Sequence, residues 1–287
     1  MISEAELTRK AYDWGVDAMV VDLDYSLGWF IAGLYRANQQ ANHLRFKGGT
    51  CLRKCYFGDY RFSEDLDFTA TIRVDPDRLG RWIEAVAKWS ADNDGPNFEA
   101  APSRVETVQD EYGGETYQAR LYFRGPLRWS GSPRAIRLDV TRNEVLVSPP
   151  ESRVLLHPYS DADLLAISAI PCYSPVEIMT EKLRAIGGQR RFAVSRDLYD
   201  IHQLSKSGLA VSEVAPMLVR KFAAREVDPI GLSVQHLTER QEDFREDWER
   251  QLSYLMQDER GIDFETAWAT AMCVVRQIEN YRRLEHP

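Results

Sequence analysis

Two short motifs in the first half of the chain limit its possible fold most. They are a Gly48-Gly49 pair and, after it, the alternating segment Asp65-Leu66-Asp67-Phe68. Residues 44–46 are typical of a short strand that ends at the glycines, and residues 50–56 have helical character with Thr50 as the expected N-cap. Residues 65–72 alternate polar and apolar side chains, as a half-buried strand does. The segment therefore predicts a strand, a glycine turn, a helix and a second strand.

This order of elements suits the binding of a phosphorylated ligand. Asp65 and Asp67 would project from the same face of their strand, where two like charges repel unless a cation neutralises them. Carboxylate pairs of this kind suit Mg²⁺, although a bare pair is also compatible with a solvated strand face. The glycine turn allows backbone amides to approach a phosphate at the N-terminus of a helix. Asp139, on a predicted strand over residues 135–141, could supply a third carboxylate if that strand lies beside the first.

The remaining pattern predicts an α+β protein with a mixed first half and a helical second half. Further helices are expected in the first forty residues, over residues 76–90 and from residue 174 onward, and a further strand over residues 116–123, whereas residues 91–102 read as a loop. Ser174-Pro175-Val176-Glu177 has the form of a capping box with proline at the first helical position. We expect one domain over residues 1–170 and a second over residues 171–287.

Composition limits the classes of partner. A net charge of −8 excludes a protein that coats nucleic acid by bulk charge, although 29 of the 36 basic residues are arginines, whose planar fork suits phosphate. The most apolar stretch, residues 27–34, is far too short to span a bilayer, and the N-terminus is acidic, so we expect a cytoplasmic protein. Cys51 and Cys55 are expected on one helix and Cys172 and Cys273 alone, which predicts reduced thiols and no cysteine-based metal site.

Several motifs together resemble a known family. Lys47-Gly48-Gly49-Thr50, then Arg61-Phe62-Ser63-Glu64-Asp65-Leu66-Asp67-Phe68, is similar to the polymerase-β-type nucleotidyltransferases and closest to their AbiEii/AbiGii toxin branch. Residues 181–185 and 196–200 (Glu-Lys-Leu-Arg-Ala and Arg-Asp-Leu-Tyr-Asp) extend the resemblance, which spans about residues 44–204. It implies a polymerase-β-like nucleotidyltransferase core, a mixed sheet with flanking helices, followed by a helical C-terminal half that contributes to the active site.

The resemblance also implies roles for individual residues. The triphosphate would be held by Gly48, Gly49, Thr50 and Ser63. Mg²⁺ would be bound by Asp65 and Asp67, and Asp139 matches the third acidic position of the superfamily. Lys182 would bind the nucleotide phosphates, and Asp197 or Asp200, which share a helix face, would complete the pocket. From the residues alone, these two aspartates could orient Lys182, hold a base or sugar, or only place favourable charge near the helix start.

Two features of the second half remain open from the residues alone. Lys182 could instead be a surface lysine paired with Glu181 or Glu177. The arginines between Arg184 and Arg196, including Gln189-Arg190-Arg191, could contact an RNA backbone or form a solvated loop.

The function implied by the resemblance is a Mg²⁺-dependent nucleotidyltransferase toxin of a toxin–antitoxin or phage-defence system. It would transfer NMP from an NTP to an acceptor hydroxyl at the 3′ end of tRNA, causing growth arrest, and an antitoxin encoded nearby would oppose it. The alternatives are nucleotidyl transfer to a small molecule or a protein, or a nucleotide-binding module without turnover. A sugar-nucleotide transferase with an Asp-x-Asp motif is disfavoured by the glycine turn and by Lys182.

Overall fold

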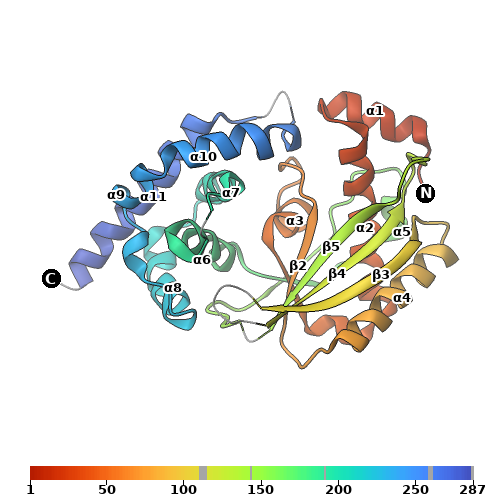
Figure 1. Cartoon of the computed structure of the whole chain (residues 1–287), viewed down its shortest axis with the longest axis horizontal. Helices are drawn as coiled ribbons and strands as arrows, with labels where there is room; N and C mark the ends of the chain where they lie inside the picture. Colours follow the sequence, from red (N-terminus) through yellow and green to blue (C-terminus); the bar gives the residue numbers. More distant parts are fainter. Residues whose placement is uncertain (110–114, 143, 191, 258–260, 286–287) are drawn as a thin grey trace. The chain divides into compact units, whose positions relative to one another are not determined.

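The structure is a computed structural model that describes residues 1–109, 115–142, 144–190, 192–257 and 261–285 (Figure 1). The chain forms two compact units. The sheet unit comprises residues 1–144, 150–172 and 255–259, and the helical unit comprises residues 145–149, 173–254 and 260–287. The division into domains at residue 170, expected from the sequence, stays a prediction.

In the described part of the chain, the sheet unit contains one mixed sheet with the strand order β3-β4-β5-β2-β1-β7-β6. Strands β2 and β5 are parallel, as are β1 and β7, and the other neighbours are antiparallel. The mixed sheet and its helices confirm the predicted α+β class. The strands are β1 (Leu44–Lys47), β2 (Asp65–Ala70), β3 (Asn97–Gln109), β4 (Glu115–Arg124), β5 (Arg134–Thr141), β6 (Glu151–Arg153) and β7 (Ile170–Cys172).

Helices α2 (Ala18–Ala37) and α4 (Pro76–Asp92) cover one face of this sheet, as Figure 1 shows. The residues that face them alternate along each strand, for example Ile136, Leu138 and Val140 of β5, all fully buried. Helix α2 is buried almost throughout from Val21 to Leu34, which explains why its apolar residues are too dense for a surface helix. The opposite face of the sheet carries the polar members of each alternation. The unit also contains α1 (Glu4–Trp14), a 3₁₀ turn (Gln39–His43) and α5 (Ala162–Leu165).

The helix after the glycine turn begins earlier than the sequence predicted. Helix α3 (Gly48–Cys51) continues as a π-helical turn over Leu52–Tyr56, and Lys47, in extended backbone conformation, is the N-cap. Thr50 is therefore inside the helix, and the prediction that it caps the helix is wrong. Its hydroxyl donates instead to the backbone oxygen of Asp65 (2.5 Å), which ties this helix to β2.

The prediction of a loop over residues 91–102 is also wrong, because β3 begins at Asn97. This strand pairs in the sheet only with β4, and its register shifts twice between Asn97 and Arg104. In an edge strand with an irregular register and an exposed face, polar and apolar residues do not alternate regularly. The sequence pattern therefore did not predict this strand.

Cys172 does not stand alone, contrary to the sequence-based expectation. Strand β7 runs parallel to β1, with Cys172 beside Phe46, and this pairing brings its thiol to the helix that follows β1. The sulfur atoms of Cys51, Cys55 and Cys172 all lie within 4.8 Å of one another and are buried. Cys273 is exposed.

The helical unit begins with α6 (Pro175–Arg184). Ser174 caps this helix by accepting from the Glu177 amide (3.1 Å), but the predicted capping box is only half formed. The Glu177 carboxylate instead accepts from the amides of Val147 and Ser148 and pairs with the buried Lys221 (2.6 Å). The other helices are α7 (Ser195–Lys206), α8 (Val211–Ala224), α9 (Val234–Glu239), α10 (Gln241–Asp247) and α11 (Phe264–Glu285). Shorter helical turns span Ala185–Gln189, Pro229–Gly231, Trp248–Leu252 and Ser253–Leu255.

Within the described ranges, the helices all fall short of the combined length and hydropathy that crossing a bilayer requires.

Candidate active site

Three aspartates occupy neighbouring positions on the polar face of the sheet. Because β2 and β5 are parallel neighbours, Asp67 lies directly opposite Asp139. Asp65 lies two residues before Asp67 on the same face of β2. The sequence could place Asp139 only on a strand; the pairing of β2 with β5 puts it beside the other two.

The ionisation of Asp139 is perturbed at this position. Burial and then the charges of Asp67 and Asp65 raise the pKa of Asp139 to about 6, although Arg137 and Lys47 oppose the shift. Asp139 has a raised pKa because it is buried and because its neighbours are negative. Carboxylate oxygens at neighbouring strand positions are ligands that suit a divalent cation such as Mg²⁺. The three residues therefore fit a metal centre.

The glycine turn packs tightly against this cluster. Gly48 has a φ of 78°, and a Cβ added to it would lie 2.4 Å from the Asp67 carboxylate oxygen Oδ2. A Cβ on Gly49 would lie 2.6 Å from Nη2 of Arg61 and 3.1 Å from Oγ of Ser63. Only glycine allows both approaches, so the turn, the carboxylates and Ser63 lie side by side.

Arg61 belongs to the motif around Ser63, but the sequence predicted no role for it. Its side chain is only 3% exposed, and its guanidinium lies against Gly49 while Nη1 donates to the backbone oxygen of Phe62 (3.1 Å). The feature of the sequence that could have identified Arg61 is its position two residues before Ser63 in the motif. Arginine is the side chain best suited to hold phosphate oxygens at such a turn.

A second cluster lies within the helical unit. The Lys182 ammonium sits between the carboxylates of Asp197 (2.7 Å) and Asp200 (2.8 Å), and both aspartates are almost completely buried. Arg190 adds a further contact to Asp197 (2.7 Å). The structure thus brings together the three residues that the resemblance selected. The Lys182 side chain is only 13% exposed, so it is not a lysine on a solvated surface.

The arginines between Arg184 and Arg196 do not form one exposed patch in the described residues. Arg184 is buried and donates to the backbone oxygen of Lys221 (3.1 Å), and Arg190 is committed to Asp197. Arg196 is half-buried on α7. Arg191, the other arginine of the predicted patch, lies outside the described residues.

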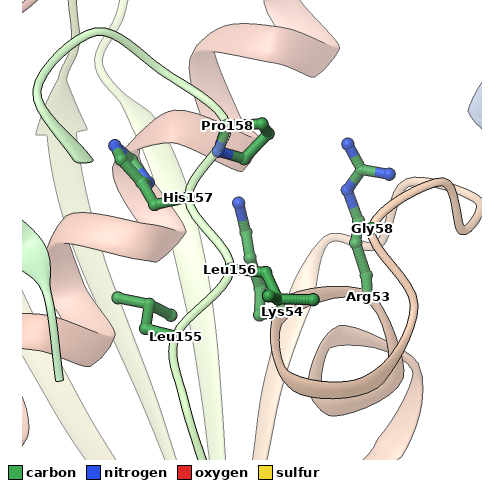
Figure 2. A pocket seen from close by; sticks show the side chains of 7 residues that line it. All are labelled: Arg53, Lys54, Gly58, Leu155, Leu156, His157 and Pro158. Atoms are coloured by element: carbon green, nitrogen blue, oxygen red, sulfur yellow. The ribbon is translucent and has the colours of Figure 1, made fainter. Parts of the chain in front are cut away.

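A separate cavity of about 280 Å³ lies in the sheet unit, where Arg53 and Lys54 project toward residues 155–158 (Figure 2). Both cations are buried and paired with Asp24, at 2.5 and 2.7 Å respectively. The Tyr159 hydroxyl donates to the same carboxylate (2.8 Å). The single Asp24 carboxylate bridges both cations, and it ties helix α2 to the helical turn that carries Arg53 and Lys54.

Comparisons with known proteins agree with this geometry. The family of the nucleotidyl transferase AbiEii toxins of type IV toxin–antitoxin systems matches residues 31–270. Among solved structures, MenT4, a nucleotidyltransferase toxin from Mycobacterium tuberculosis H37Rv, is similar over 97% of this chain and 90% of its own, with 21% identity and a TM-score of 0.62.

A candidate nucleotidyltransferase from H. pylori is similar over 95% of this chain and 100% of its own, with 15% identity and a TM-score of 0.59. At these identities the two structures show the shared fold. The search of curated proteins found no match. The family match covers most of the chain, including the carboxylates, the glycine turn and the Lys182 cluster, and so this protein belongs to the AbiEii family of nucleotidyltransferase toxins of type IV toxin–antitoxin systems.

Proposed function

We propose that this nucleotidyltransferase is Mg²⁺-dependent and transfers NMP from an NTP to the 3′ hydroxyl of a tRNA, in the cytoplasm, and so arrests growth in a toxin–antitoxin or phage-defence role. The observation that carries this proposal is the direct pairing of Asp67 with Asp139 beside Asp65, next to the Gly48-Gly49 turn. The family implies an antitoxin partner, and we propose that this antitoxin is encoded nearby.

Each part of the sheet-unit site has a role in this reaction. Asp65, Asp67 and Asp139 would hold the metal, which when bound neutralises phosphate charge and lowers the pKa of the attacking hydroxyl. The amides of Gly48 and Gly49, the Ser63 hydroxyl and the Arg61 guanidinium would bind triphosphate oxygens. Thr50 would contribute through its backbone, because its hydroxyl donates to Asp65. One of the carboxylates would accept the proton of the acceptor hydroxyl.

The proposed chemistry is tested by incubating the protein with each of four labelled NTPs and with RNA, protein and small-molecule fractions in turn. We expect label in the RNA fraction, at the 3′ end of tRNA, with release of pyrophosphate and only when Mg²⁺ is present. Label in protein or in a small molecule would show that the acceptor is not tRNA. NTP binding without pyrophosphate release, whichever acceptor is added, would indicate a nucleotide-binding module without turnover.

We further propose that Lys182 binds the nucleotide phosphates and that Asp197 and Asp200 hold its ammonium in place. Two buried carboxylates around one lysine fix its position. The Lys182 side chain is 13% exposed, so a ligand can still reach it. The geometry also allows a simpler role, in which Lys182 only neutralises the two aspartates.

Replacement of Lys182 by methionine distinguishes these roles. If Lys182 binds phosphate, K182M should raise the KM for NTP by about 10- to 100-fold, the effect of losing a charged hydrogen bond of about 1.5–3 kcal/mol. The matched control is K221M in the same unit, because Lys221 is also a buried lysine between two carboxylates, those of Glu177 and Glu181. We expect K221M to lower the free energy of unfolding without raising KM. Equal KM values in K182M and the wild type would leave Lys182 a purely structural role.

A further inference from the structure

The polar face of the sheet that carries the carboxylates also carries a row of arginines. Arg104 of β3 lies opposite Arg120 of β4, and Arg120 lies opposite Arg137 of β5. Arg137 in turn lies opposite Asp65 of β2. Directly paired residues point to the same face and neighbouring strands are about 4.8 Å apart, so the row runs from the carboxylates to the edge of the sheet.

All three arginines are exposed. Because Arg137 is two residues before Asp139 on β5, the row lies on the same face of the sheet as the carboxylates. Like charges at directly opposite strand positions are unfavourable, and here three follow one another. A neutral or mixed row would stabilise the sheet better. Such an arrangement is expected where an anion longer than one phosphate lies across the strands, because each guanidinium can then hold a phosphate.

An aromatic side chain lies next to this row on the same face. Tyr122 is two residues after Arg120 on β4, and its partners on either side are Ala101 and Ala135. Tyr122 is half-buried, and its two neighbours are too small to cover its ring. A partly open aromatic ring beside arginines is the combination with which proteins bind single-stranded nucleic acid, because the ring stacks on a base while the cations hold phosphates.

We propose that Arg104, Arg120, Arg137 and Tyr122 form the surface that binds the single-stranded end of the acceptor RNA and leads it to the carboxylates. This inference rests on the proposed function, because it assigns the acceptor to one face of the sheet. The arginines bind the phosphates and Tyr122 stacks on a base. Arg137, the last arginine of the row, lies opposite Asp65. A single strand of RNA that lies along the row therefore reaches the metal centre without crossing the edge of the sheet. The row also gives an acidic chain a local surface for RNA, because three exposed positive charges lie in it.

The test measures binding, not transfer. A fluorescent single-stranded RNA oligonucleotide is titrated with protein in the absence of NTP, by anisotropy, over a range of salt concentrations. The triple variant R104Q/R120Q/R137Q is compared with R9Q/R73Q/R81Q, which removes three exposed arginines away from this face, on α1, in the turn after β2 and on α4.

Each phosphate contact on a single strand contributes about 0.7 to the slope of log K against log salt concentration. Loss of three contacts should therefore reduce the slope by about 2 and weaken binding about 100-fold at 0.1 M salt. Y122A should weaken binding about tenfold through the lost stacking, and Y122F should restore it. We expect the control triple variant to bind RNA almost as the wild type does.

Equal RNA affinity in the row variant and the wild type, or an equal loss in both triple variants, would overturn the inference. If the row variant keeps its RNA affinity and still transfers label to RNA, only this inference is overturned and the proposed function stands. Label found only in protein or small molecules would overturn the proposed acceptor, whatever the row variants do.

Discussion

Replacement of Asp67 by asparagine should abolish nucleotidyl transfer while the protein stays folded. Asp67 lies between Asp139 and the Gly48 turn, so it is the carboxylate best placed to hold a metal next to the phosphates. Charge stabilisation by a bound metal is worth several kcal/mol, which corresponds to a loss of at least about 10³-fold in kcat/KM. The rate is measured as pyrophosphate release with the acceptor identified in the labelling experiment.

The same substitution should make the metal-free protein more stable. Removing one of three neighbouring negative charges relieves repulsion of about 1–3 kcal/mol, so the free energy of unfolding without Mg²⁺ should rise. D77N, at an exposed position on α4, is the control and should change neither quantity appreciably. Retained activity in D67N would contradict the assignment of the metal centre, whereas loss of both activity and stability would indicate a structural role for Asp67.

Replacement of Asp24 by asparagine should destabilise the sheet unit by about 3–5 kcal/mol, because two buried cations would lose their shared counter-ion. Arg53 and Lys54 are 3% and 1% exposed, and both contact the Asp24 carboxylate. Burial alone would raise the pKa of Asp24, but the charges of Arg53 and Lys54 outweigh it and hold the pKa well below its ordinary value. A loss of this size is a large part of the stability of a typical domain, and chemical denaturation measures it directly.

The effect of D24N on the free energy of unfolding should depend on pH. A carboxyl whose pKa is lowered by folding contributes stability that is present above its unfolded pKa, about 4, and is lost as the pH falls below it. The difference in unfolding free energy between the wild type and D24N should therefore shrink in acid. The double variant D24N/K54M should recover part of the loss, because it buries one unpaired cation fewer. A D24N variant as stable as the wild type at neutral pH would show that water or another group replaces the carboxylate.

Local patterns in the sequence were sufficient for the elements with a regular period. The alternation through Asp65 and Asp67 gave strand β2, and the capped apolar stripe after Ser174 gave helix α6. The edge strand β3 and the three-residue strands β6 and β7 were missed, because irregular register and short length leave no period to read. The partner of Glu177 was also missed, since Lys221 lies on another helix.

The sequence by itself determined which residues could carry the chemistry: the glycine turn that follows a strand, the paired aspartates, and a lysine with two aspartates one helical turn apart. Only the tertiary structure decided which of them meet. The parallel pairing of β2 with β5 placed Asp139 opposite Asp67, and the packing of α6 against α7 placed Lys182 between Asp197 and Asp200. The arginine row exists only through strand register, because Arg104, Arg120 and Arg137 are unremarkable until three strands align them. The physical reason is that period and capping are local properties of a chain, whereas charge clusters depend on which distant segments pair.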